Sequence, residues 1–295
     1  MLLRLLFVML WASAAIAAKL GLYSSPPLTL ATIRFIAAGM ILFAFVYVLN
    51  RRYAWPSRAE WIPLILLGLL NTTIYLGLSF WAFTTVSAGI FNLFVTVNPF
   101  IVALLSHIFL HRKILGREWT GMGLSAIGLS IATFPSLMES SATLPGLAAV
   151  AIGMIAMASG SVYFKKKDLQ LPGIVINTWQ VLLGGILLMP FTVWFEFDQG
   201  VRLDMYFWGS LIWLVAAVSI GAMLLWFRLL KQDPVKANNW LFATPIMGYL
   251  LAAIFLHETI TPFDGIGTVL VIIGLISSGN VTLRKLAPAS KSSGG

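Results

Sequence analysis

Polar side chains recur within stretches of this chain that are otherwise apolar, and their types could bind a small solute. Asn71, Tyr75 and Ser79 are spaced i, i+4 and i+8, which predicts that they share one face of a helix. Amides and hydroxyls can bond the amino and carboxylate groups of a solute, or they can tie two helices together. With deep aromatic residues, the candidate binding residues are Ser13, Asn71, Tyr75, Ser79, Asn92, Asn98, Ser159, Tyr163, Trp226, Asn238, Asn239 and Phe242.

Arg34 is the only charge placed well inside an apolar stretch. A buried arginine could bind a substrate carboxylate. Alternatively, its long side chain could reach the nearer interface or bond backbone carbonyl groups. The sequence leaves both roles open.

Other chemistry finds little support. None of the three histidines pairs with a serine by spacing, and they form no evident metal cluster. The chain has no cysteine, which excludes disulfides and thiol nucleophiles. The net charge of +9 comes without a basic run interleaved with aromatics, so nucleic acid is not an expected partner. We expect no enzymatic activity, no cofactor and no bound metal.

The composition instead predicts an all-α integral membrane protein. Of the 295 residues 59% are hydrophobic and 10% are charged, far from a soluble domain. A membrane span needs about twenty apolar residues. The chain holds ten such stretches, near 2–22, 28–49, 61–83, 87–110, 114–135, 144–165, 173–195, 206–229, 235–256 and 263–283.

The basic residues predict the orientation, because positively charged loops stay cytoplasmic. With Arg34 set aside, sixteen cations fall at every second boundary of the spans, and only Lys19 and Arg202 fall at the others. Both termini are therefore expected in the cytoplasm. The first stretch resembles a cleavable signal peptide, but its residues take part in the repeat described next, which favours a retained span.

The second half of the chain repeats the first at a fixed offset. Asn98-Pro99 corresponds to Thr244-Pro245, with 245 − 99 = 146, and the same offset carries Gly121 onto Gly267 and Arg34 onto Gln180. Five spans separate equivalent points, so the halves should be inserted upside down relative to each other. We expect five-helix repeats at 1–140 and 141–286 and a disordered tail at 287–295.

Pro99 and Pro245 lie within spans at equivalent positions, where proline removes a backbone hydrogen bond and bends a helix. Each could be a hinge or a static kink. The freed carbonyl groups, at Val95 and Leu241 in a regular helix, must find other partners or face water.

These repeat residues resemble the drug/metabolite transporter superfamily, in its EamA-like ten-helix branch. The motif of that branch appears in the second half as Pro245, Leu256-His257-Glu258, Gly267 and Gly274, while Arg112 replaces the glutamate in the first half. In overall character the chain is similar to YddG-type exporters of aromatic amino acids. The resemblance implies an inner-membrane carrier with a central cavity between the halves, lined mainly by helices 1, 3, 4, 6, 8 and 9.

The expected function is therefore export of amino acids, aromatic or otherwise apolar, by alternating access in the bilayer, with the chain acting as a monomer. Export of other small metabolites or drugs, such as purines or amphiphiles, is the alternative, and a channel or lipid scramblase is a distant one. No carboxylate lies deep in a span, so uniport and proton coupling both stay open.

Overall fold

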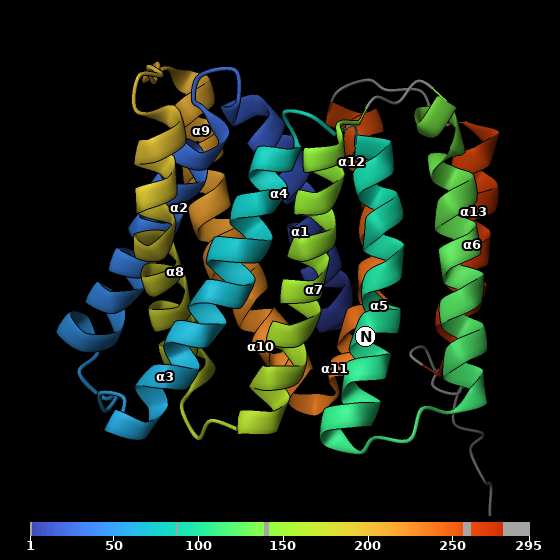
Figure 1. Ribbon diagram of the computed structural model, residues 1–295, viewed down its shortest axis with the longest axis horizontal. Helices are drawn as coiled ribbons and strands as arrows, with labels where there is room; N and C mark the ends of the chain where they lie inside the picture. The colour runs from blue at the N-terminus through green and yellow to red at the C-terminus, as the bar shows by residue number, and fades with distance from the viewer. Residues whose placement is uncertain (1, 87, 139–141, 256–260, 280–295) are drawn as a thin grey trace, which may run out of the picture.

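The computed structural model describes residues 2–86, 88–138, 142–255 and 261–279, which form a bundle of helices (Figure 1). The predicted tail at 287–295 and Glu258 lie outside the described residues. Apart from one bridge between Val86 and Ala142, every described element is helical. In chain order the α-helices are α1 Leu2–Gly21, α2 Pro27–Phe43, α3 Arg58–Leu67, α4 Gly77–Ala82, α5 Ala88–Leu110, α6 Gly116–Met138, α7 Leu144–Lys167, α8 Gly173–Glu196, α9 Met205–Trp213, α10 Met223–Gln232, α11 Pro234–Asn239, α12 Ala243–Phe255 and α13 Pro262–Ser277.

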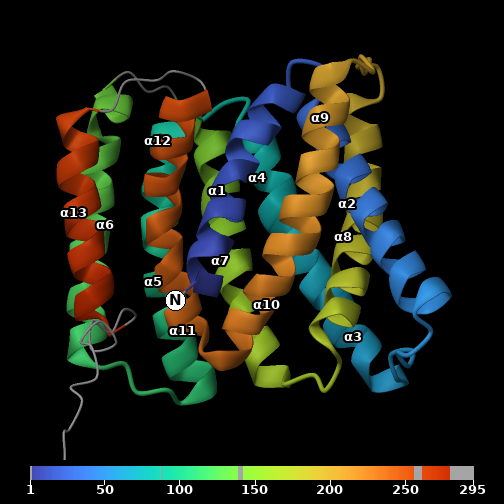
Figure 2. The same ribbon diagram turned by 180° about the vertical axis from the view of Figure 1, so that it is seen from behind.

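π-helical and 3₁₀ segments connect some of these α-helices into longer helical rods. The π-helical segments are η1 Ala44–Leu49, η2 Gly68–Leu76 and η3 Leu214–Ala222, and η4 Trp240–Phe242 is a 3₁₀ turn. Seen from behind, α9 and α10 lie along one rod with η3 between them (Figure 2). The observed helix bounds follow the expected spans to within a few residues, except that α13 ends at Ser277 and the end of the last expected span, 280–283, lies outside the described residues.

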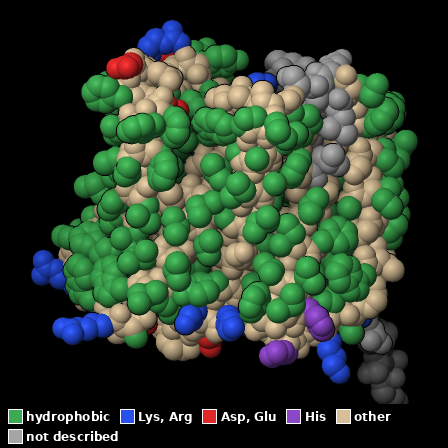
Figure 3. Space-filling model, in the orientation of Figure 1, with side chains coloured by type: hydrophobic (Ala, Val, Ile, Leu, Met, Phe, Trp, Pro, Cys, Tyr) green, Lys and Arg blue, Asp and Glu red, His purple; other side chains and the backbone are tan. Residues whose placement is uncertain are grey.

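Six helical stretches in the described residues are long and apolar enough to cross a membrane: Leu2–Gly21, Pro27–Leu49, Arg58–Ala82, Leu144–Lys167, Gly173–Glu196 and Met205–Gln232. Phe94–Leu110 and Pro262–Ser277 are shorter apolar helices. In Figure 3, apolar side chains cover the middle of the visible face, and most of the Lys and Arg side chains in view lie along its lower edge. We call this the basic end of the bundle; it includes the loop between α5 and α6 and the junction of α10 with α11 (Figure 1).

Polar caps fix where several helices begin. The Asp204 carboxylate accepts hydrogen bonds from the N–H groups of Tyr206 and Phe207, both at 3.0 Å, and starts α9. Asp233 caps α11 in the same way, through Val235 and Lys236 at 2.9 and 3.2 Å. Such caps satisfy N–H groups that have no partner within the helix.

Close backbone packing joins α6 to α13. A Cβ added to Gly128 would lie 2.7 Å from the Gly267 carbonyl oxygen, and one added to Gly121 would lie 2.5 Å from that of Gly274. Because the lower number on α6 meets the higher on α13, the two helices run antiparallel. Between these glycines, Ser125 Oγ lies 3.5 Å from the carbonyl oxygen of Val271, the residue 146 positions later.

Helices α2 and α8 pack in the same manner. A Cβ on Gly39 would lie 2.6 Å from Leu182 Cβ, and one on Gly185 would lie 3.1 Å from Ile36 Cγ1. The repeat relates the two sides of this contact, because Gly185 lies 146 residues after Gly39 and Leu182 lies 146 residues after Ile36. Small residues allow this approach, as is common where membrane helices pack.

The π-helical segments were not expected from the sequence. They fall at equivalent places, since 214 − 68 = 146 and 222 − 76 = 146 relate η2 to η3. A π-helix bonds i to i+5 in place of i+4, so side chains across it shift phase relative to an α-helix. Short π segments are frequent at functional sites.

Candidate functional site

The first and second halves of the chain meet closely at the basic end. There α11 packs on α5, and α10 packs on α1. At the opposite end α1 packs on α9, and α4 packs on α7. The two halves are therefore in contact at both ends of the bundle, and at the basic end these contacts bring charged and aromatic side chains together.

An ion-paired triad holds the contact at the basic end. Arg112, between α5 and α6, donates to both oxygens of Glu118 at 2.7 and 3.0 Å, and to Asp233 Oδ2 at 2.8 and 3.2 Å. Burial acts to lower the pKa of Arg112, but hydrogen bonds and charge from the two carboxylates outweigh it and raise that pKa. Because Asp233 begins α11, the triad ties the first half of the chain to the second.

Aromatic rings fill the space just inside the triad. Trp226 of α10 is buried and stacks on Phe7 of α1, with ring centroids 5.2 Å apart, and Trp11 lies 6.3 Å from it. The Arg4 guanidinium lies over the Trp240 ring at 5.9 Å. These rings pack α1 against α10 and η4.

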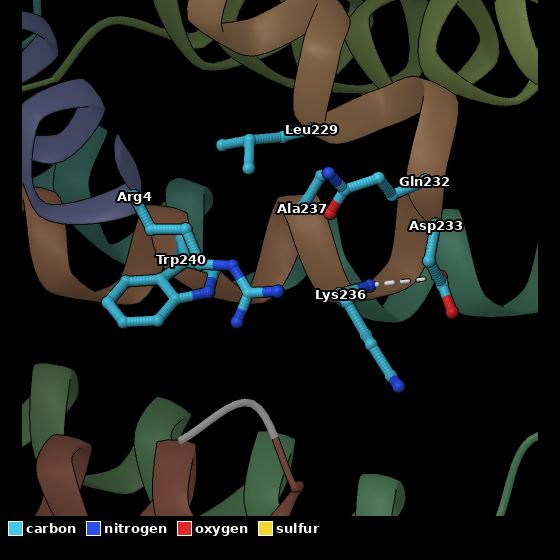
Figure 4. Close-up of a pocket in the computed structure, with 7 residues that line it drawn as sticks. All are labelled: Arg4, Leu229, Gln232, Asp233, Lys236, Ala237 and Trp240. Atoms are coloured by element: carbon cyan, nitrogen blue, oxygen red, sulfur yellow. Dashed lines mark hydrogen bonds between the residues drawn. The ribbon is translucent and has the colours of Figure 1, made fainter. Parts of the chain in front are cut away.

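A small hollow remains between α1, α10 and α11 (Figure 4). Its volume of about 30 Å³ is enough for a water molecule or two, whereas small-molecule pockets usually exceed about 300 Å³. Its walls are Arg4, Leu229, Gln232, Asp233, Lys236, Ala237 and Trp240. The hollow is a gap in a closed contact, too small for an amino acid.

Three of the predicted amides are enclosed in this region with hydrogen-bonding groups unused. Asn98 donates to the Met157 sulfur at 3.0 Å while its Oδ1 has no partner, and Asn238 donates to the Pro234 carbonyl at 2.9 Å while its Oδ1 has none. Asn239 is only 1% exposed, and neither its Oδ1 nor its Nδ2 has a partner. A buried polar atom left unpaired costs about 1–3 kcal/mol, so this arrangement stores free energy.

An apolar cluster connects the elements that carry these amides. Val102 of α5, Ala158 of α7 and Val235 of α11 pack together with the predicted residue Phe242, which is 1% exposed. Ser159, beside Ala158, is half-buried. Asn92 lies in α5, and its side chain is outside the described part of the structure.

The two prolines occupy different local structures. Helix α5 continues through Pro99, whereas Pro245 is the third residue of α12, directly after the η4 turn. The Leu241 carbonyl, expected to lose its bond to Pro245, accepts one from the Thr244 hydroxyl at 2.7 Å. A side chain thus replaces the missing backbone donor in the second half.

The η2 residues pack against α7 and α8. Asn71 donates to Gln180 Oε1 at 3.0 Å and covers Gly160, while Tyr75 packs on Gly153. Ser79 of α4 bonds the Tyr75 carbonyl at 2.6 Å. All three side chains are buried, and Asn71 has the helix-joining role that amides can take in membranes.

Two predicted residues lie away from the closed contact. Ser13 donates to the Leu10 carbonyl at 2.7 Å and accepts from Trp213 Nε1 at 2.9 Å, where Trp213 is 48% exposed. Tyr163 is half-buried, with the Lys167 ammonium 5.8 Å from its ring centroid. The structure does not bring them to the amides of α5 and α11.

Sequence reasoning missed Gln180 and Asn177 as polar groups inside the bundle, and it missed the triad. One signal was available for Gln180, its correspondence to Arg34 at the offset of 146. The only hint of the triad was that Arg112 stands where the second repeat has Glu258.

Comparison with known proteins places the chain among transporters. The model of the EamA-like transporter family matches residues 1–134 and again residues 144–279. The "Probable amino-acid metabolite efflux pump" of Salmonella typhimurium is 24% identical over 92% of this chain and 92% of its own. The "Uncharacterized inner membrane transporter YedA" of Escherichia coli is 25% identical over 95% of this chain and 90% of its own.

A solved structure agrees on the fold. A protein known by crystal structure superposes with a TM-score of 0.79, covering 97% of this chain and 98% of the other at 18% sequence identity. At that identity the likeness shows the arrangement of helices alone.

Proposed function

We propose that this chain, which belongs to the EamA-like transporter family, exports amino acids with apolar or aromatic side chains by alternating access. It is a multi-pass protein of the inner membrane, and its family and its relatives' names indicate transport and not catalysis. The substrate class, the direction of transport and the mechanism are our proposal.

The proposed topology has ten spans with both termini in the cytoplasm. The helices α5, α6, α12 and α13 then cross the membrane beside the six stretches named above, and the basic end faces the cytoplasm. Residues 1–140 and 141–286 form inverted five-helix repeats. The double match of the family model, the antiparallel packing of α6 on α13 and the paired π segments support this division.

The observation that carries the mechanism is the set of enclosed amides at a contact between the halves. Asn98, Asn238 and Asn239 leave four polar atoms unpaired while the basic end is closed. Opening that end would expose these atoms to water or to a substrate and recover their hydrogen bonds. The same opening must break the Arg112 triad, so the unpaired amides favour the open state and the triad favours the closed one, as a two-state carrier requires.

Each group in this region then has a role in the cycle. Substrate enters from the cytoplasm when α10 and α11 move away from α1 and α5, and the amides bond its polar groups. Trp226 and Phe242 supply apolar surface for its side chain. The η4 turn before Pro245 and the proline in α5 are the proposed hinges. Since one chain holds both halves, a monomer suffices.

Counterflow in proteoliposomes tests this proposal. Vesicles holding the purified protein and unlabelled phenylalanine should take up labelled phenylalanine transiently and saturably, and leucine should compete. Adenine and tetraethylammonium serve as unrelated competitors. Uptake inhibited by adenine but by no amino acid would refute the substrate class, and flux without counterflow would indicate a channel.

An imposed pH gradient addresses coupling. Because no carboxylate lies deep in a predicted span, we expect flux to follow the substrate gradient with little response to pH. Strong dependence on the proton gradient would refute uniport while leaving export intact.

A further inference from the structure

Arg34 is buried in the interior of the bundle without an acidic partner among the described residues. Its side chain is 3% exposed, and its one described hydrogen bond runs from Nε to the Ser219 hydroxyl at 2.8 Å. Arg112, in contrast, pairs with Glu118 and Asp233. A buried cation whose one described hydrogen bond goes to a hydroxyl is costly in a membrane interior, which makes it a functional-site candidate.

The Arg34 guanidinium contacts both the rod that contains η2 and the rod that contains η3. Ser219 belongs to η3, and the ring centroid of Phe80, in the α4 helix that continues η2, lies 5.8 Å from the guanidinium carbon. The ring of Phe35 lies 5.0 Å from that carbon. Arg34 therefore lies where equivalent helices of the first and second halves approach each other, between aromatic faces.

Polar groups around Arg34 suit a zwitterion. Asn177 is fully buried and donates to the Ser219 carbonyl at 2.9 Å, while its own Oδ1 has no partner. One residue, Ser219, thus contacts both a cationic donor and a side chain with a free acceptor. A carboxylate fits the planar guanidinium, and an ammonium group fits the amide oxygen.

The second half of the chain supplies an internal comparison. The equivalent of Arg34 is Gln180, which is also fully buried and accepts from Asn71 at 3.0 Å. A neutral side chain therefore fulfils the packing role at the matching position. Packing at this position therefore does not require the positive charge that Arg34 carries in the first half.

We propose that Arg34 binds the carboxylate of the transported solute, so that substrates are apolar or aromatic molecules bearing a carboxylate. This inference rests on the proposed transport function and names Arg34 as the residue that recognises the negative charge of the substrate. The carboxylate takes the place of the Ser219 hydroxyl at the guanidinium, and the Phe35 and Phe80 rings border the site. A carboxylate without an amino group should bind too, more weakly than the amino acid.

Three probes separate the charges of the ligand: phenylalanine, 3-phenylpropanoate, which lacks the amino group, and 2-phenylethylamine, which lacks the carboxylate. Binding is measured by ligand-induced thermal shift and titration of the full chain in detergent. The wild-type protein should bind phenylalanine best, 3-phenylpropanoate less well and 2-phenylethylamine not measurably.

The test variant is Arg34→Gln, which copies the residue of the other half and should fold. We expect it to weaken both carboxylates about tenfold or more, the usual loss for a charged hydrogen bond. Arg58→Gln removes the same charge from an exposed position and should bind like wild type. If Arg34→Gln unfolds without ligand, Arg34→Lys keeps the charge but loses the planar fork, and it should bind carboxylates more weakly than wild type.

The outcomes distinguish this inference from the transport proposal. Wild-type affinity for carboxylates in Arg34→Gln, or in a folded Arg34→Lys, would overturn the inference even if phenylalanine is transported. Failure of the wild type to bind either carboxylate, or equal binding of 2-phenylethylamine, would also overturn it. Arg34-dependent binding of 3-phenylpropanoate without any phenylalanine transport would uphold it and refute the amino-acid proposal.

Discussion

Breaking the Arg112 triad should open the basic end, and Asp233→Asn is the sharpest way to do so. Asp233 Oδ1 caps α11 while Oδ2 accepts from Arg112, so the two duties fall on different atoms. Asparagine caps a helix as well as aspartate does. Its amide nitrogen, however, would donate toward a guanidinium that can only donate. The substitution should keep α11 intact and remove one arm of the triad.

The expected size follows from exposure. The side chains of Arg112 and Asp233 are 19% and 22% exposed, between the surface pairs that contribute up to about 1 kcal/mol and the buried pairs whose rupture costs about 3–5 kcal/mol. We therefore expect Asp233→Asn to destabilise the closed state relative to the open one by about 1–2 kcal/mol, which raises the open population about 5- to 30-fold. Glu118 stays paired, so opening should not become complete.

Because the chain has no cysteine, a single introduced thiol reports the opening. Ala237→Cys places the thiol on α11, at a residue that is 3% exposed and borders the small hollow. A membrane-impermeant maleimide added from the basic end should label it about 5- to 30-fold faster when Asp233→Asn is present. Asp204→Asn, the same change at the cap of α9, is the matched control. Equal labelling with and without Asp233→Asn would refute the reasoning.

Three further results are expected. Gly128→Leu should lower the thermal unfolding midpoint sharply, because its Cβ would meet the Gly267 carbonyl at 2.7 Å, whereas Gly123→Ala, with nothing within 4 Å, should not lower it. Thr244→Val should cost about 1 kcal/mol in denaturant unfolding by leaving the Leu241 carbonyl unpaired, and no loss would mean that this bond does not compensate for Pro245. Hydrogen bonds from Ser24, Phe207 and Tyr206 lower the pKa of Asp204. The ionised Asp204 carboxylate therefore stabilises the folded state above the ordinary aspartate pKa, and this stabilisation is lost as pH falls through the lowered pKa. The stability difference between wild type and Asp204→Asn should therefore be constant near neutral pH and change only in acid, as thermal unfolding across pH would reveal.

The helix bounds were predictable because a hydrocarbon core demands long apolar runs and confines charges to their ends. The repeat relates Gly121 to Gly267 and Gly128 to Gly274, but only the structure shows that Gly121 packs on Gly274 and Gly128 on Gly267. A π-helical turn, in contrast, leaves no mark in hydropathy, so η2 and η3 were found only in three dimensions. The i, i+4, i+8 face assumed for Asn71 and Ser79 crosses the end of such a segment.

The site was harder to predict than the fold. The sequence identified Asn239 as a buried polar group, but whether an amide is paired depends on neighbours remote in the chain. Arg112 meets Asp233 across 121 residues, and no local pattern predicts that pair. Ser13 and Ser159 are equivalent by the repeat, yet the first bonds Trp213, which shows that equivalent residues can meet different surroundings.

Alternation itself is tested most directly by two thiols placed at opposite ends. Phe91→Cys reports on the end opposite the basic one, where Phe91 is half-buried, and Ala237→Cys reports on the basic end. If the protein alternates between two states, Asp233→Asn should raise the maleimide labelling rate at position 237 and lower it at position 91. A rise at both positions, or no change at position 91, would contradict alternating access.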